Sequence, residues 1–489
     1  MRLHLRAVIS ILVCEALILS SVGCGHRTVA PQTPLSAAVF NPLQEYLQKS
    51  YLELFQLAPT LEFSQSQIDE MRKYLNESKD YCVGQFKGHS DQYDKQLEQA
   101  QADLKQQTPK LSDSQRKEKH CQIQNLRALK GQAEILADQA IPVAYENKLA
   151  KLELIEKWPD QFKAIKAEIA DGSYKKRRWS DVEDVGFRQL FPGQQDDIKD
   201  GQEAIQQMKQ AGLLPPEIED KEVVEYVNTL GNRIAKLSDL RVPLKVTLLN
   251  SKEINAFALP GGFLFVQRGL IEAAEDESQL AGVLAHEIAH AAARHGHRLM
   301  TKATITSVIY QAAQVAAVLL TGGIAGIGTY YALQYGFYGL GLLLSLNLLG
   351  VSREFELEAD QLGIQYAWNS DYDPNGFIRF FDKMATREGY VNGVSWFRTH
   401  PPFYQRMVDA QREILFLREK SEYIVQSTEF QEMKKKLAKV SKKTDKEEKN
   451  RPSLKAPEQD CPPPDKIEYE PGQPIEKLCK LPTRIKLGQ

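Results

Sequence analysis

The sequence predicts an α+β fold that is mainly helical, in which a domain of long helices precedes a domain with a small β-sheet. Three observations predict it. Residues 41–196 are rich in Gln, Glu, Lys and Leu and poor in Gly, which is typical of long helices. Apolar and β-branched runs at 245–250 and 262–266 indicate strands, which we expect a Gly-Gly turn to join. Apolar residues at helical spacing follow from 280 to 291.

Residues 1–24 have the pattern of a lipoprotein-type signal peptide. Two arginines precede an apolar run that ends near Cys24, the expected lipidated residue. Glu15 interrupts the run and Ser21 stands where Leu is usual, so a simple secretory signal and an uncleaved anchor stay open as alternatives. All three place the bulk of the chain outside the cytosol. Since Gly25 follows the cysteine, we expect a periplasmic, membrane-anchored lipoprotein of the cell envelope, at the outer membrane.

Composition divides the rest of the chain into four parts. We expect a linker at 25–40, a helical domain at 41–196, a second domain at 197–440, and a charged linker with a Pro-rich tail at 441–489. The formal net charge of -2 argues against a nucleic-acid-binding surface on the helical domain, which we interpret as an antiparallel helical hairpin. No motif indicates an oligomeric state.

The cysteines agree with export to an oxidising compartment. Apart from Cys24 and one cysteine inside the signal peptide, four remain, at Cys82, Cys121, Cys461 and Cys479. An even set predicts two disulfide bonds, for which three pairings are possible. Cys82 with Cys121 and Cys461 with Cys479 is the simplest pairing, because it joins neighbours along the chain.

Residues 303–352 form an apolar insert that carries no charged side chain. Two stretches, 303–320 and 330–349, are each about long enough to cross a bilayer, so a membrane hairpin is sterically possible. Several glutamines, an asparagine and several tyrosines make these stretches poor spans. We therefore favour a segment that is buried or lies on the membrane surface over a true span, with contacts to lipid or hydrophobic substrates in either case.

The motif His-Glu-Ile-Ala-His at 286–290 indicates a metal site. On a helix, His286 and His290 lie four residues apart and project from one face, so both can bind one zinc ion. Glu287 lies between them and can reach a zinc-bound water as general base. With nine histidines in 489 residues the pattern is uncommon by chance. This arrangement is typical of the centre of a metallopeptidase.

A second segment supplies the missing ligand. Zinc peptidases with a third histidine place it six residues after the second, but Gly296 occupies that position. Glu356 and Asp360 share one face of a predicted helix, so Glu356 can bind the metal while Asp360 accepts the free ring N–H of His286. Glu354 is a weaker candidate for the ligand. We expect one Zn²⁺ per chain.

Blocks of sequence around the motif resemble a known family. They occur in family order at Asn255–Val266, Leu280–His290, Ala293–His295, Glu356–Asp360 and Thr399–Pro402, followed by Arg406. They are similar to the zinc peptidases that include HtpX, the CAAX prenyl proteases and several bacterial periplasmic lipoprotein proteases, and the lipoprotein members are the nearest. The resemblance implies a zincin-type peptidase domain within 197–440. It also implies a zinc metalloendopeptidase that cleaves unfolded or misassembled envelope proteins.

The resemblance places three further residues near the metal. His400 lies near the zinc in this family, where it can stabilise the oxyanion, bind the zinc in a latent state, or serve only the structure. Arg406 is expected to pair with an acidic group, and His295 is expected to support the ligands or to face solvent. Beside the protease we keep one alternative function, a periplasmic chaperone or assembly factor with latent protease activity.

Overall fold

The computed structural model describes residues 43–105, 111–210, 214–252, 254–299, 353–388 and 404–450 and a few positions between 461 and 479. The signal peptide 1–24 with Cys24, the linker 25–40, the apolar insert 303–352 and His400 lie outside the described residues. Within the described part of the chain, no helix combines the length and the apolar character needed to cross a membrane.

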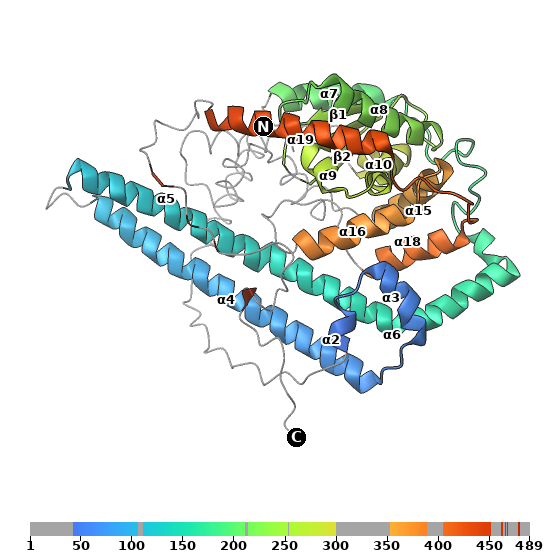
Figure 1. Ribbon diagram of the computed structural model, residues 1–489, viewed down its shortest axis with the longest axis horizontal. Helices are drawn as coiled ribbons and strands as arrows, with labels where there is room; N and C mark the ends of the chain where they lie inside the picture. The colour runs from blue at the N-terminus through green and yellow to red at the C-terminus, as the bar shows by residue number, and fades with distance from the viewer. Residues whose placement is uncertain are drawn as a thin grey trace, which may run out of the picture. The chain divides into compact units, whose positions relative to one another are not determined.

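The first half of the described chain consists of helices. They are α2 (Leu43–Tyr46), α3 (Tyr51–Leu57), η1 (Ala58–Thr60), α4 (Gln65–Lys105), α5 (Asp113–Ile135), the π-helical turn η2 (Leu136–Ala140), α6 (Ile141–Asp171) and η3 (Ser173–Lys176). Ser112 begins α5 through a capping box with Gln115, whose side chain accepts from the Ser112 N–H. The long helices α4 and α5 run side by side (Figure 1). They form the expected kind of hairpin.

The second half surrounds a small sheet. Its helices are α7 (Asp197–Gln210), α8 (Lys221–Lys236), α9 (Arg268–Ala273), α10 (Glu277–Ala292), α11 (His295–Leu299), α15 (Arg353–Asn369), α16 (Asn375–Glu388), α18 (Tyr404–Phe416) and α19 (Thr428–Asn450). Its strands are β1 (Lys245–Leu249), β2 (Ala256–Leu259) and β3 (Phe263–Gln267). A mainly helical chain with one small sheet confirms the predicted α+β class.

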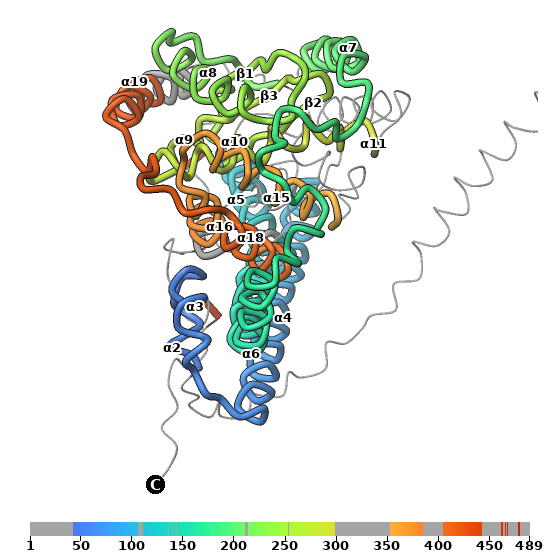
Figure 2. Tube along the Cα trace, turned by 90° about the vertical axis from the view of Figure 1, so that its right-hand side faces the viewer, coloured from blue at the N-terminus to red at the C-terminus, as the bar shows by residue number. Residues whose placement is uncertain are grey.

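The sheet has the order β1-β3-β2, so β3 lies between its two neighbours (Figure 2). β3 pairs in parallel with β1 and antiparallel with β2. Gly261 and Gly262, at φ +83° and +81°, form the tight turn from β2 to β3. Our expectation that this turn joins 245–250 to 262–266 is wrong, because so short a turn can connect only antiparallel neighbours and β1 is parallel to β3. β2 is the strand that the sequence analysis missed.

The core of this half is built around α10. Leu280, Val283, Leu284 and Ile288 are buried on this helix, as the apolar spacing predicts. α10 packs against α15, α16, α8 and β2. A side chain at Gly363 would meet the backbone of α10 at a distance of 2.9 Å, so this glycine allows α15 to approach α10 closely.

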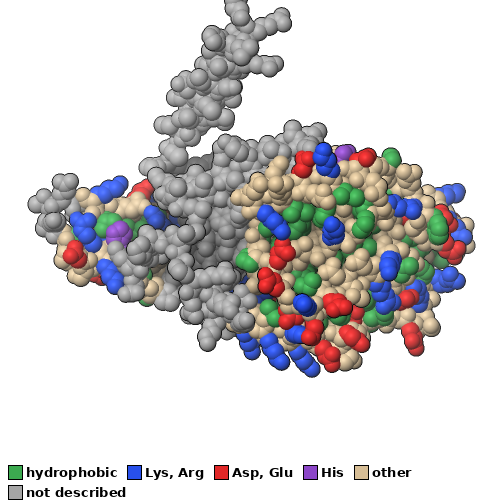
Figure 3. Space-filling view, turned by 90° about the horizontal axis from the view of Figure 1, so that it is seen from above, with side chains coloured by type: hydrophobic (Ala, Val, Ile, Leu, Met, Phe, Trp, Pro, Cys, Tyr) green, Lys and Arg blue, Asp and Glu red, His purple; other side chains and the backbone are tan. Residues whose placement is uncertain are grey.

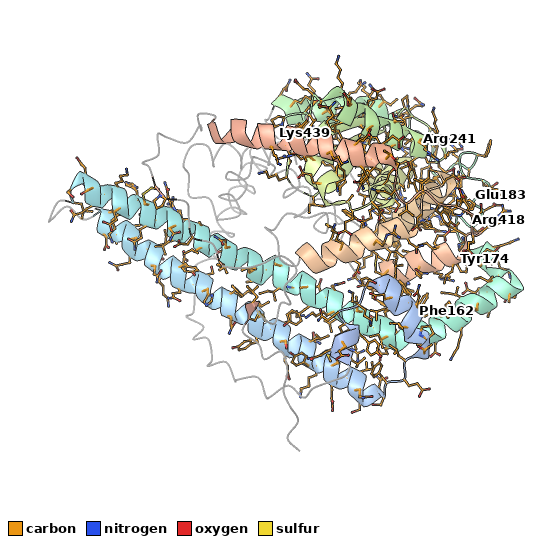
Figure 4. The ribbon with its side chains drawn as sticks, in the orientation of Figure 1. Phe162, Tyr174, Glu183, Arg241, Arg418 and Lys439 are labelled. Carbon is orange, nitrogen blue, oxygen red and sulfur yellow. A yellow bond between two sulfur atoms is a disulfide. The ribbon has the colours of Figure 1, made fainter. Side chains whose placement is uncertain are left out.

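Buried polar contacts join the long helices to the second half of the chain. α6 packs on α16 and α18, and the ammonium of Lys151 on α6 lies 2.9 Å from a carboxylate oxygen of Asp382 on α16. In η3, just after α6, Tyr174 lies beside α18 and stacks on Phe416 at a centroid distance of 5.1 Å (Figure 4). These contacts hold α6 and η3 against the domain that carries the His-Glu-Ile-Ala-His motif. On the face seen in Figure 3, acidic and basic side chains are interspersed.

Two disulfide bonds connect the tail to the hairpin. Cys82 on α4 pairs with Cys479, and Cys121 on α5 pairs with Cys461. Two disulfides confirm that prediction, but the simplest pairing is wrong. The tail lies along α5, since the backbone N–H of Asp465 donates to Asn125 at 2.7 Å. Cysteines that are neighbours along the chain are therefore not bonded to each other.

Replacing both Cys121 and Cys461 with serine should lower the free energy of unfolding by about 2–4 kcal/mol, because the bond restricts a long loop in the unfolded chain. Urea unfolding followed by circular dichroism measures this loss, with reduced wild-type protein as the reference for removal of both bonds. Peptide mapping without reductant should give a Cys121–Cys461 peptide. A Cys82–Cys121 peptide instead would contradict the pairing.

Candidate metal centre

Helix α10 carries the two histidines and the glutamate of the motif. The side chain of Asp276 caps the helix by accepting from the backbone N–H of Gln279 at 2.9 Å. His286 and Glu287 are each 1% exposed, so the helix presents them inside the protein rather than to solvent. The buried apolar face of α10 therefore supports the motif, as metal ligands require.

Helix α15 brings a carboxylate to the two imidazoles. Nε2 of His290 lies 3.0 Å from Nε2 of His286 and 3.3 Å from Oε1 of Glu356, and Nε2 of His286 lies 3.6 Å from Oε2 of Glu356. Tetrahedral zinc with bonds of about 2.0–2.1 Å separates its ligand atoms by about 3.3 Å. The three observed distances bracket this value, so His286, His290 and Glu356 fit one zinc ion.

The other side of His286 faces a buried ion pair. Nδ1 of His286 lies 2.9 Å from Oδ1 of Asp360. Arg406 donates to Asp360 through Nε at 2.6 Å and Nη2 at 2.7 Å, and its Nη1 lies 2.9 Å from Oε2 of Glu356. The arginine therefore holds the carboxylates of Glu356 and Asp360 together. With its Nδ1–H directed to Asp360, His286 keeps the Nε2 lone pair for the metal.

Burial and charge set the protonation of these groups. Burial lowers the pKa of His290 to about 4, which leaves its imidazole neutral and able to bind metal near neutral pH. Burial acts in the same direction on His286, but the carboxylates of Asp360 and Glu356 outweigh it and raise the pKa of His286. Burial opposes ionisation of Asp360, yet Arg406 outweighs it and lowers the pKa of Asp360. Asp360 is thus a charged acceptor.

The remaining candidates take different positions. Glu287 is buried. Burial lowers the pKa of the Arg406 guanidinium, but nearby carboxylates, among them Glu287, outweigh burial and raise it. Glu354 is exposed, and it is absent from the group of described ligand atoms that could share a metal. Glu356 is therefore the ligand that this helix offers. His400 lies outside the described residues.

Two further buried residues, His295 and Glu358, lie next to the ligands. His295 is 2% exposed, and its Nδ1 lies 2.8 Å from Nδ1 of His290. Its Nε2 lies 3.2 Å from Oε2 of Glu358. The side chain of His297 is 47% exposed and lies beside Asp197 instead. A periodic pattern could not place His295, because α10 ends between it and His290.

A family model matches the part of the chain that carries the metal centre, and several known proteins are similar to part of this chain. Residues 222–414 match the model described as Peptidase family M48. The beta-barrel assembly-enhancing protease of Yersinia pestis is 33% identical over 212 residues, which are 42% of this chain and 41% of that protein. The protein of the same name from Escherichia coli K12 is 30% identical over 222 residues, 44% of this chain and 43% of that protein.

A eukaryotic relative matches the same kind of domain. A mitochondrial metalloendopeptidase of Schizosaccharomyces pombe is 31% identical over 187 residues, which are 37% of this chain and 50% of that protein. The chain thus spans half or less of the length of these three relatives. The family match, at 222–414, includes the residues of the metal centre.

Proposed function

Residues 222–414 match the model of Peptidase family M48, and on that premise we propose that the whole chain is a zinc-dependent endopeptidase of the cell envelope. The observation that carries the proposal is the set of three buried or half-buried ligand atoms 3.0–3.6 Å apart, with Glu287 next to the first ligand in the same helix. A binding protein without catalysis would have no need for this carboxylate.

The chemistry follows from the residues of the chain. His286, His290 and Glu356 would hold the zinc. When bound, zinc acts as a Lewis acid that acidifies a water molecule and polarises the substrate carbonyl. Glu287 accepts the proton of the attacking water and later delivers it to the nitrogen of the leaving amine. The peptide bond is hydrolysed without a covalent bond between enzyme and substrate, because water itself is the nucleophile.

The sheet offers a place for the substrate backbone. β2 packs against α10, which carries the motif, and β3 is its one strand neighbour among the described residues. The other edge of β2 can therefore receive an extended chain through main-chain hydrogen bonds. Folded proteins rarely present an extended segment with free backbone groups, so unfolded or misassembled proteins are the substrates that we propose.

Location and substrates are proposed on separate grounds. The signal pattern with Cys24 supports a periplasmic lipoprotein anchored in the outer membrane. Two disulfide bonds agree with an oxidising compartment. The bacterial relatives are named for enhancing the assembly of β-barrels, which supports misassembled envelope proteins as substrates. We propose that His400 acts at the zinc, either on the oxyanion or as a ligand that keeps the site latent.

Removal of the metal tests the proposed function. The full chain should cleave a reduced and alkylated protein that cannot refold and should leave its folded, oxidised form intact. A chelator should abolish cleavage, because three ligands without zinc cannot activate water, and one equivalent of Zn²⁺ should restore it. Gel electrophoresis of the products and the zinc content of the protein are the measurements. Cleavage that persists in chelator would contradict the proposal, and zinc binding without any cleavage would favour the chaperone.

A further inference from the structure

The second zinc ligand has a partner of its own. His295, the first residue of α11, is buried, and its Nδ1 lies 2.8 Å from Nδ1 of His290. At this distance one nitrogen donates a proton and the other accepts it, because two protonated or two bare nitrogens would repel each other. The Nε2 of His295 lies 3.2 Å from a carboxylate oxygen of Glu358.

Glu358 decides the direction of this hydrogen bond. An ionised carboxylate can only accept, so His295 carries its proton on Nε2 and keeps a lone pair on Nδ1. His290 must then donate from Nδ1, which leaves the lone pair of its Nε2 facing Glu356 at 3.3 Å. We propose that His295 and Glu358 form a positioning relay that holds His290 in the tautomer and orientation that bind zinc. The inference rests on the zinc site of the proposed function.

Several groups hold Glu358 in place at the site. The indole N–H of Trp179 donates to Oε1 of Glu358 at 3.0 Å, and Nη2 of Arg178 lies 3.2 Å from the same oxygen. Arg298 donates to Oε2 at 3.0 Å, the oxygen that also faces His295. The carboxylate therefore has partners on both oxygens and cannot rotate without breaking them. A group with such limited freedom can transmit a fixed orientation to His295.

Stacking fixes the plane of the His295 ring. The ring lies parallel to Phe355, with a centroid distance of 4.5 Å and an angle of 7° between the planes. The guanidinium of Arg298 lies 4.1 Å from the centroid of Phe355 and 4.1 Å from that of Phe191. The imidazole is thus the end of a stack of aromatic and cationic groups. Its nitrogens stay aligned with His290 and Glu358 because the ring cannot tilt freely.

The backbone between the two helices turns His295 back toward His290. Arg294 has a φ of +54°, which is uncommon for a residue with a side chain. Asp197 holds it, accepting from Nε at 2.7 Å and from Nη2 at 2.6 Å. A continued α-helix would carry a residue five positions after His290 away from that side chain. The bend at Arg294 instead places His295 against it, which supports a dedicated role in positioning the ligand.

The two nitrogens of His295 can be tested separately. In His295→Asn the amide oxygen replaces Nδ1 as the acceptor for His290, whereas in His295→Gln the amide reaches the position of Nε2 and leaves His290 without its acceptor. We expect His295→Gln to weaken zinc binding about 10–100-fold and His295→Asn to stay within about threefold of wild type. His297→Asn, on the half-exposed side of the same helix, is the matched control and should bind zinc as wild type does.

Zinc affinity is measured by competition with a coloured chelator, and the absorption spectrum of the cobalt-substituted proteins reports the geometry of the ligands. Melting of the metal-free proteins shows whether the variants differ in stability alone. Equal zinc affinities and cobalt spectra for His295→Gln and His295→Asn would overturn the relay, since a purely structural histidine does not distinguish them. A wild-type protein that binds no zinc would contradict the proposed function as well.

Discussion

Replacing Glu287 with glutamine is expected to lower kcat for hydrolysis of an unfolded protein by about 10²–10⁴-fold while zinc stays bound. The amide has nearly the shape of the carboxylate but cannot accept the proton of the attacking water. Glu287 is not one of the three residues whose atoms fit the zinc, so the substitution should leave the metal site intact. Initial cleavage rates and zinc content of both proteins are the measurements.

A carboxylate outside the site supplies the control for this experiment. Glu275 lies just before α10 and is largely exposed, with its partner Lys383 on α16. Glu275→Gln removes the same charge near the same helix and should leave kcat unchanged. Full activity of Glu287→Gln would refute the role of general base. Loss of zinc together with activity would show that Glu287 serves the metal site rather than the proton transfer.

Replacing Arg406 with methionine is expected to lower the free energy of unfolding by about 3–5 kcal/mol, because one partner of a buried ion-pair network is removed. Arg406 is fully buried and contacts both Asp360 and Glu356. Without it, the two buried carboxylates remain close together with no guanidinium between them. Urea unfolding of the metal-free protein measures the loss, since bound zinc would compensate part of the charge.

The same helix contains a matched control. Arg412 on α18 pairs with Glu168, but its side chain is 39% exposed. Arg412→Met should cost about 1 kcal/mol or less, because solvent screens a partly exposed pair. Similar losses for Arg406→Met and Arg412→Met would mean that the buried network contributes no more than a surface pair. In that case the ion pairs of Arg406 would not explain how Glu356 and Asp360 are held in place.

Much of the candidate site could be read from local spacing. His286 and His290 lie four residues apart in one helix, as do Glu356 and Asp360, so helical geometry alone brings each pair onto one face. The structure places the two pairs together because Gly363 lets α15 approach α10. His295 could not be placed in this way, since the positive φ of Arg294 interrupts the helical period immediately before it.

The local sequence pattern could not predict which strands and which cysteines pair with each other. The strand run at 245–250 predicts β1, but nothing in it indicates that β1 pairs in parallel with β3. The short strand β2 has four residues, two of them half-buried, which is too little alternation to distinguish a strand from a loop. Cysteine spacing likewise gives the number of disulfides and leaves their partners open, because pairing depends on where the tail lies.

The two disulfides also close two covalent rings, one inside the other. Cys82 and Cys479 are 397 residues apart in the sequence, and the bond between Cys121 and Cys461 is nested inside that interval. Residues 222–414, which match the peptidase family model, lie within both rings. A single cut in either ring opens it without separating the chain into two molecules. A chain that is cut once within a ring therefore keeps its hairpin, its second domain and its tail covalently joined until the disulfide bonds are reduced.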